Sequence, residues 1–370
     1  MKNLEKYLSL LDGEADGLLL TSRYSRHYCA EFDIAEGMAV VSKSGCRYFT
    51  DSRYLESAQK NIRDFTVLDV GTGRGYVRRI NDAISDFGIT CLGYEEKYLT
   101  AEELLSFEEE LKAPLLPISG KLNAFRDVKE PWELERMKKA QAITDKAFAE
   151  ILTKIRPGMT ELALQAELIY AMYKNGATGL AFDPIVISGP NTSLPHGVAG
   201  ERVIQPGDFI TMDFGAAWQG YCSDMTRTVA VGSASAEMRY VYSVVLEAQQ
   251  TAIEATKAGL TGAEIDAIAR NVIAKAGYGG FFGHSYGHGL GLEIHEGPNL
   301  SPRYEKPIPA GAVCSAEPGI YLPGKFGVRI EDVTMIAENG TIEPEKSHYC
   351  LRFFSVSSCI SVAFAVQYMS

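Results

Sequence analysis

The sequence has little that would mark an exported, disulfide-linked or nucleic-acid-binding protein. Its 7 cysteines form no Cys-x-x-Cys pair and are odd in number, so reduced thiols in a cytoplasm fit better than a disulfide framework. Asp12 and Glu14 interrupt the N-terminal region before an apolar signal segment can form. Acidic residues outnumber basic ones by 47 to 36, which argues against nucleic acid as a partner.

Long uncharged apolar runs are also scarce, and the one exception is the C-terminus. Residues 353–370 carry no charge, but the run holds 5 serines and is barely long enough to span a bilayer. We therefore expect an atypical apolar tail over residues 344–370 rather than a membrane anchor. The rest of the chain is ordinary for a folded protein, because 46% of its 370 residues are hydrophobic and the length suggests about two domains.

The first part of the sequence alternates short apolar runs with polar, helix-prone stretches. This alternation predicts a small α/β domain over residues 1–125. The expected strands cover residues 17–20, 37–41, 46–50 and 65–70, and the expected helices cover residues 54–62 and 77–87.

The pattern changes at Pro131, where apolar residues begin to recur at helical spacing. A long amphipathic helix is expected from Pro131 to Ile155, because Gly158 follows just beyond it. Further helices are expected over residues 161–174, 236–257 and 262–276. Thr261 and Glu264 stand in capping-box spacing at the start of the last of these helices.

An internal repeat joins these helices to chemically reactive residues. Gly158-Met159-Thr160 opens one helix, and Gly259-Leu260-Thr261 opens another in the same way. A histidine and two carboxylates follow each helix in the same order: His196, Asp213 and Asp224, then His295, Glu317 and Glu331. Two such halves related by a pseudo-twofold axis would gather four carboxylates around one point. The repeat predicts an α+β catalytic domain over residues 126–343.

Asp213 and Asp224 lie on an expected hairpin of residues 209–218 and 221–230, which turns at Gln219-Gly220. Depending on the register, the two carboxylates are either opposite or diagonal on one face. Carboxylates that close repel each other unless a cation or a proton lies between them. Because the neighbours of Asp213 are apolar, a buried site is favoured over two solvated acids.

Residues 284–296 carry the densest signal in the chain. Three of the 6 histidines fall here, and Gly287, Gly289 and Gly291 alternate around His288. Such glycines allow a close approach to the backbone. One histidine with four carboxylates is an oxygen-rich donor set that suits Mn²⁺, or Co²⁺, Fe²⁺ or Zn²⁺ as availability decides. Four carboxylates balance two divalent ions, so the pattern indicates metal-assisted hydrolysis of an amide.

These motifs resemble the M24 metallopeptidases of the pita-bread fold, and within them the Xaa-Pro peptidases, aminopeptidase P and prolidase. Residues 284–296 are similar to the signature of that subfamily throughout, and residues 50–54 are similar to a motif of its N-terminal domain. The resemblance covers residues 1–343 and implies an α/β N-terminal domain followed by a pita-bread catalytic domain. The segment after residue 343 departs from the family pattern.

The resemblance also implies a role for each candidate residue. The metal ligands would be Asp213, Asp224, His288, Glu317 and Glu331. Among them, Asp224 and Glu331 would bridge both ions, and Glu317 would also move the proton of a bridging hydroxide. Two histidines, His196 and His295, would contact the substrate and the oxyanion. Supporting positions in the substrate pocket would be His284, Tyr321 and Arg329.

The activity that this implies is a cytoplasmic, two-metal Xaa-Pro aminopeptidase, acting as a homodimer on peptides with proline at the second position. An Xaa-Pro dipeptidase is the alternative, because the sequence does not show whether the far end of the site is closed. More remote alternatives are a metal-free creatinase-like amidinohydrolase and a non-catalytic peptide-binding protein. Both tend to lose metal ligands, whereas all five ligand types are present here.

Overall fold

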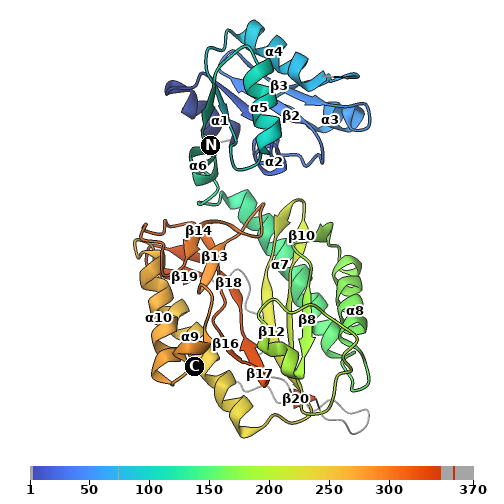
Figure 1. The fold of residues 1–370 in the computed structure, drawn as a ribbon, viewed down its shortest axis with the longest axis vertical. Helices are drawn as coiled ribbons and strands as arrows, with labels where there is room; N and C mark the ends of the chain where they lie inside the picture. Colours follow the sequence, from blue (N-terminus) through green and yellow to red (C-terminus); the bar gives the residue numbers. More distant parts are fainter. Residues whose placement is uncertain (1–2, 74, 343–352, 355–370) are drawn as a thin grey trace. The chain divides into compact units, whose positions relative to one another are not determined.

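We describe the protein from a computed structural model, in which residues 3–73, 75–342 and 353–354 are placed. The chain divides into two compact units, Met1–Arg126 and Asp127–Ser370 (Figure 1). Each unit is described by itself. The predicted apolar tail over residues 344–370 lies outside the described residues, apart from the two-residue strand β20 (Phe353–Phe354). No helix among the placed residues is long and apolar enough to cross a membrane.

The first unit is built on a sheet of 6 strands in the order β4-β3-β2-β1-β5-β6. Its strands are β1 (Gly17–Leu20), β2 (Met38–Ser42), β3 (Gly45–Thr50), β4 (Thr66–Asp69), β5 (Leu92–Tyr94) and β6 (Leu115–Pro117). Its helices are α1 (Asn3–Leu8), η1 (Ser9–Asp12), α2 (Arg23–Ala30), α3 (Leu55–Asn61), α4 (Gly75–Phe87), α5 (Ala101–Glu110) and α6 (Ser119–Ala124). Strands β1, β2 and β3 pair antiparallel and the outer strands pair parallel. The predicted α/β character of this unit is confirmed.

The second unit begins with a half that contains two long helices and a sheet. Its elements are α7 (Pro131–Leu152), α8 (Glu161–Lys174), β7 (Gly179–Leu180), β8 (Ile185–Ser188), η2 (Gly189–Ser193), β9 (Phe209–Phe214), β10 (Ala216–Trp218), β11 (Tyr221–Cys222) and β12 (Met225–Val231). Strand β9 pairs antiparallel with both β8 and β12. Apolar side chains of α7 and α8, such as Phe148 and Leu168, pack with Met212 of β9 in one core.

The second half likewise begins with two helices, which are followed by strands. It contains α9 (Ala236–Ala255), α10 (Gly262–Lys275), η3 (Gly279–Phe281), β13 (Gly287–Gly289), β14 (Glu296–Leu300), β15 (Val313–Ala316), β16 (Gly319–Leu322), β17 (Phe326–Arg329), β18 (Asp332–Ala337) and β19 (Gly340–Ile342). Strand β15 pairs antiparallel with β13 and β18. Val245, Ile265 and Ile320 belong to a second core. In Figure 1, α9 and α10 lie at the left edge of this unit and α8 at its right edge, with strands of both halves between them.

The local signals that predicted the helices are present in the structure. Helix α7 starts at Pro131, and α8 is capped by the Thr160 side chain, which accepts from the Ala163 N–H. Thr261 and Glu264 form the expected capping box of α10. The predicted pita-bread fold class is confirmed, with two related halves in one catalytic unit.

Candidate metal centre

The first half positions two aspartates on a hairpin. The turn at Gln219 and Gly220 has φ values of 48° and 83°, the left-handed conformation that a tight hairpin requires. Asp213 faces Thr226 in the β9–β12 ladder, and Asp224 lies two residues before Thr226. The two carboxylates are therefore diagonal rather than opposite. A Cβ on Gly215 would lie 1.9 Å from the Ser223 carbonyl oxygen, so this hairpin closes only around glycine.

The second half positions a histidine and two glutamates around β15. His288 lies in β13, while Glu317 follows β15 and Glu331 precedes β18. A Cβ on Gly287 would lie 2.0 Å from the Ser315 carbonyl oxygen, and one on Gly289 would lie 2.2 Å from that of Gly297. The alternating glycines therefore let β13 lie against its neighbours with His288 between them, as the sequence pattern indicated.

The side chains from both halves meet in one cluster. Potential ligand atoms of Asp224, His288 and Glu331 all lie within 4.8 Å of one another. The Nε2 atom of His288 is 3.6 Å from Oδ2 of Asp224 and 3.2 Å from Oε1 of Glu317. The fifth predicted ligand, Asp213, forms an ion pair of 2.6 Å with Arg329. Three predicted ligands thus already share metal-binding spacing, and the other two border them.

Two carboxylate oxygens support the fit to a metal ion. Oδ1 of Asp213 and Oε1 of Glu331 are buried without a hydrogen-bond partner among the described residues. A buried carboxylate oxygen without a donor is unfavourable unless a cation compensates it. The atoms that would bind the metal are carboxylate oxygens and one imidazole nitrogen, the set that suits hard and borderline divalent ions. The residues present therefore fit the divalent ions that the sequence predicted.

The pKa values of the buried carboxyl groups also show that their negative charges are unfavourable without a cation. Burial raises the pKa of Asp224 well above its usual range, and the nearby charges of Asp213 and Glu317 raise it further. Burial likewise raises the pKa of Glu331, together with the charges of Asp224, Glu317 and Asp213. Without a cation these carboxyl groups favour their protonated forms. A metal ion would take the place of those protons.

Glu317 and His288 behave in the opposite way because they pair with each other. Burial alone would raise the pKa of Glu317, but the hydrogen bond from His288 lowers it to about 2. Burial would lower the pKa of His288, but the same hydrogen bond raises it to about 9. A metal-ligating histidine must be neutral, so a metal at Nε2 would displace this proton.

Two hydroxyl groups support the glutamates from neighbouring strands. Thr226 donates to Oε2 of Glu331 over 2.7 Å, and Ser315 donates to Oε1 of Glu317 over 3.1 Å. The sequence analysis missed both residues. The signal that could have found them is spacing, because each lies two residues from a predicted ligand, Asp224 and Glu317, along extended chain.

The three predicted pocket residues form a chain of contacts that ends on Asp213. Nε2 of His284 is 2.8 Å from the Tyr321 hydroxyl, which accepts from Arg329 over 2.8 Å. Arg329 then donates to Oδ2 of Asp213 over 2.6 Å. Burial lowers the pKa of His284, which favours the neutral ring. Tyr321 would then donate to Nε2, while Nδ1–H donates to the Ser285 carbonyl.

The two predicted substrate histidines are exposed, unlike the predicted ligand His288. The ring centroids of His295 and His288 are 4.4 Å apart, with the planes at 71°. Partial burial lowers the pKa of His295, and the positive charge of His288 lowers it further. His196 also contributes to lowering the pKa values of His284 and His295, so it lies within electrostatic reach of both. The structure thus brings every predicted site residue to one region.

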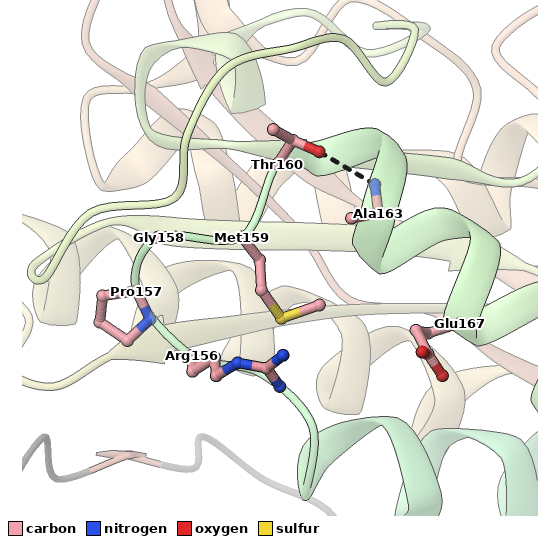
Figure 2. Close-up of a pocket in the computed structure, with 7 residues that line it drawn as sticks. All are labelled: Arg156, Pro157, Gly158, Met159, Thr160, Ala163 and Glu167. Carbon is pink, nitrogen blue, oxygen red and sulfur yellow. Dashed lines mark hydrogen bonds between the residues drawn. The ribbon is translucent and has the colours of Figure 1, made fainter.

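A separate pocket lies at the start of α8 and does not belong to this region. Figure 2 shows its 7 lining residues, Arg156, Pro157, Gly158, Met159, Thr160, Ala163 and Glu167. Its volume is about 520 Å³. None of these lining residues is a predicted site residue, and Thr160 is already used in capping α8 (Figure 2).

Comparison with known proteins agrees with the fold and identifies the family. Residues 135–338 match the model of metallopeptidase family M24, and residues 3–128 match the creatinase/prolidase N-terminal domain. The chain is 42% identical over 326 residues to the uncharacterized peptidase YqhT of Bacillus subtilis, covering 88% of this chain and 92% of that protein.

Two solved structures show the same architecture. The Xaa-Pro dipeptidase from Bacillus anthracis superposes with a TM-score of 0.91 at 41% identity, covering 96% of this chain and 99% of that chain. The X-Pro aminopeptidase from Thermotoga maritima superposes with a TM-score of 0.88 at 37% identity, covering 95% and 99% of the two chains.

The architecture is that of the pita-bread peptidases, and the carboxylate–histidine cluster lies within the part of the chain that matches family M24. The chain belongs to metallopeptidase family M24, and its relatives include Xaa-Pro peptidases of both kinds.

Proposed function

We propose that the protein is a two-metal Xaa-Pro aminopeptidase, which removes the N-terminal residue from peptides with proline at the second position. The observation that carries this proposal is the meeting of four carboxylates and His288 from two related halves, with carboxylate oxygens of Asp213 and Glu331 left without donors among the described residues. The similarity to a dipeptidase and to an aminopeptidase supports the Xaa-Pro bond as the target.

The ions would be held by the five predicted ligands: Asp213, Asp224, His288, Glu317 and Glu331. When bound, divalent ions lower the pKa of water and polarise a carbonyl group. The resemblance implies that Asp224 and Glu331 would serve both ions, and both carboxyl groups are buried among the charges of the other acids. Mn²⁺ is our proposed ion, since the donor set is dominated by oxygen.

The remaining residues would bind the substrate and move protons. By the family resemblance, Glu317 would accept a proton from the attacking water and pass it to the leaving amine, and its carboxylate lies at the edge of the cluster, 3.2 Å from Nε2 of His288. His196 and His295 are exposed and close to the cluster, so they would donate hydrogen bonds to the substrate carbonyl and its oxyanion. Arg329 and Tyr321 would hold Asp213 in position.

We further propose that the enzyme acts as a homodimer in the cytoplasm. The dimer follows from the family resemblance. The cytoplasm is supported by the 5 described cysteines, Cys29, Cys46, Cys91, Cys222 and Cys314, which are all free thiols.

The second candidate function is an Xaa-Pro dipeptidase, and the similarity to the dipeptidase from Bacillus anthracis favours it. Hydrolysis of Ala-Pro and Ala-Pro-Ala by metal-stripped protein, with and without added Mn²⁺, separates the two. Mn²⁺-dependent cleavage of both peptides is expected for the aminopeptidase. Cleavage of Ala-Pro alone would make the protein a dipeptidase, and no cleavage by folded, metal-loaded protein would contradict both proposals.

A further inference from the structure

Helix α9 carries a buried polar side chain, Gln249, where its buried neighbours on the helix are apolar. Gln249 is 2% exposed and lies beside Val245, Ala248 and Ala252, which belong to the apolar core. A buried amide without hydrogen bonds is unfavourable in proteins. An apolar residue would fill this helix position more simply, so the contacts of Gln249 call for an explanation.

The side-chain nitrogen of Gln249 makes two hydrogen bonds. It donates to the Ala316 carbonyl over 3.2 Å and to Oδ2 of Asp332 over 3.0 Å. Ala316 directly precedes Glu317, and Asp332 directly follows Glu331. A single side chain on α9 therefore contacts the neighbours of both glutamates of the candidate metal centre.

Asp332 extends this contact to the first half of the catalytic unit. Its other oxygen, Oδ1, accepts from Nη2 of Arg227 on β12. Arg227 is 3% exposed, and its Nη1 donates to the carbonyl of Glu331 itself. We call Gln249, Asp332 and Arg227 the bridge, because together they join α9, β18 and β12 behind the glutamates.

The bridge lies where the two glutamates leave the sheet. Ala316 and Asp332 are partners at the end of the β15–β18 ladder, and no further pair follows them in that ladder. From this point one strand continues to Glu317 and the other arrives from Glu331. The hydrogen bonds of Gln249 therefore hold the backbone of Ala316 and the side chain of Asp332 just where the ladder ends.

We infer that Gln249 is a positioning residue that acts through Asp332 and Arg227, and that it holds Glu317 and Glu331 at the spacing that binds metal. The inference rests on the proposed function, because it takes both glutamates as metal ligands. Partners behind a first layer of ligands commonly change metal affinity by about 10–100-fold when they are removed. Gln249 would act in this way without touching the ions or the substrate.

The direct test is metal affinity in a matched pair of variants. In Gln249→Glu the side chain keeps its shape but loses both donors and brings a negative charge towards Asp332. In Gln250→Glu the same change falls on the neighbouring residue, which is exposed. We expect metal-stripped Gln249→Glu to bind Co²⁺ at least about 10-fold more weakly than the wild type. Gln250→Glu should bind as the wild type does. Visible absorption of bound Co²⁺ and equilibrium dialysis measure this without an activity assay.

Two further variants separate positioning from folding. Gln249→Met removes the donors without adding a charge, and it should also weaken Co²⁺ binding. In Gln249→Glu with Asp332→Asn, the new amide can donate to the new carboxylate, so one bond of the bridge is restored. We expect part of the lost affinity to return. Thermal unfolding of the metal-stripped proteins shows whether each variant is folded before Co²⁺ is added.

The possible results lead to different conclusions. Co²⁺ affinities of Gln249→Glu and Gln249→Met equal to that of the wild type would overturn the inference. So would a loss of affinity that follows a loss of thermal stability and is not recovered in the double variant. A wild-type protein that is folded and binds no Co²⁺ would instead contradict the proposed metal centre, on which the inference rests.

Discussion

The two halves of the catalytic unit supply corresponding acids but support them differently. Asp213 of the first half is held by Arg329 of the second, and Glu331 of the second half is held by Thr226 of the first. Only Glu317 has both of its described hydrogen-bond partners, His288 and Ser315, in its own half. Neither half could therefore build this site alone, although the repeat gives each half the same order of residues.

The histidines show the opposite relation between the halves. His196 and His295 occupy corresponding places in the repeat, and both are exposed. The acids thus differ in their surroundings while the paired histidines remain alike. This contrast agrees with a role for the histidines towards the substrate, which arrives from solvent, and a role for the acids towards buried ions.

The largest effect is expected when a ligand at the centre of the cluster loses its charge. Glu331→Gln removes the charge of the most buried acid among the predicted ligands, which is 1% exposed, while it preserves the side-chain shape. We expect hydrolysis of Ala-Pro-Ala to fall at least about 1,000-fold, equivalent to about 4 kcal/mol of transition-state stabilisation. Bound Mn²⁺, measured after dialysis, should fall as well. Glu338→Gln, at an exposed position, is the matched control, and equal activity of the two variants would contradict the role of Glu331.

The next largest effect concerns the ion pair by which Arg329 of the second half supports Asp213 of the first. Arg329→Met leaves Asp213 without its 2.6 Å ion pair, and we expect Mn²⁺ affinity to fall about 10–100-fold. Arg329→Lys keeps the charge but cannot contact Asp213 and Tyr321 through one rigid fork, so it should restore only part of the affinity. Full affinity in Arg329→Met would show that Asp213 needs no partner.

A smaller effect compares the two hydroxyl supports. Thr226→Val removes the donor to Glu331 across the halves, and Ser315→Ala removes the donor to Glu317 within one half. We expect each variant to bind Mn²⁺ about 10-fold more weakly. Each variant also removes a 3.0 Å acceptor, Thr226 that of the Arg329 side chain and Ser315 that of the His288 backbone N–H. The Thr226 variant should lose more, because it loosens the supports of both Glu331 and Asp213. Isothermal titration of the stripped proteins measures both affinities, and a larger loss in Ser315→Ala would reverse this ranking.

The smallest effect concerns stability without metal. Asp224→Asn removes a buried carboxyl group that, without metal, must either stay protonated or carry its charge beside Asp213 and Glu317. The stripped variant should therefore melt a few degrees higher than the stripped wild type, at about 2–4 °C per kcal/mol. The folded-state pKa of Asp224 is raised, so its contribution to stability falls as the pH rises above about 4. The gap between the two melting temperatures should therefore widen from pH 4 to pH 7.

The control for this experiment is Asp183→Asn, at an exposed position. This variant should melt as the wild type does at both pH values. A gap for Asp224→Asn that stays constant with pH would mean that charge repulsion at Asp224 is not what destabilises the stripped protein.

Much of this arrangement could be predicted from the sequence, because it depends on local patterns. The hairpin turn at Gln219-Gly220 and the capping of α10 by Thr261 follow from neighbouring residues. The repeat predicted which acids would gather. The diagonal placement of Asp213 and Asp224 could not be predicted, because it depends on the ladder register beyond the break at Gly215.

The supporting residues were missed for a different reason. Gln249 lies 67 residues from its acceptor Ala316, and Arg227 lies 105 residues from Asp332. A single glutamine in an amphipathic helix resembles any solvated position until the tertiary contacts are known. Hydrogen bonds between distant segments leave no periodicity in the sequence, whereas ligands in a repeat do.

The close contacts at Gly287 and Gly289 also determine how far the centre can adjust. Main-chain atoms meet there with no room for a methyl group, at 2.0 and 2.2 Å from a Cβ placed on either residue. The strand that carries His288 therefore cannot move closer to its neighbours, and its hydrogen bonds to β14 and β15 resist its moving away. The position of this strand is consequently fixed by main-chain contacts. Replacing a carboxylate of the cluster by an amide would change the charge offered to an ion and leave that strand position unchanged.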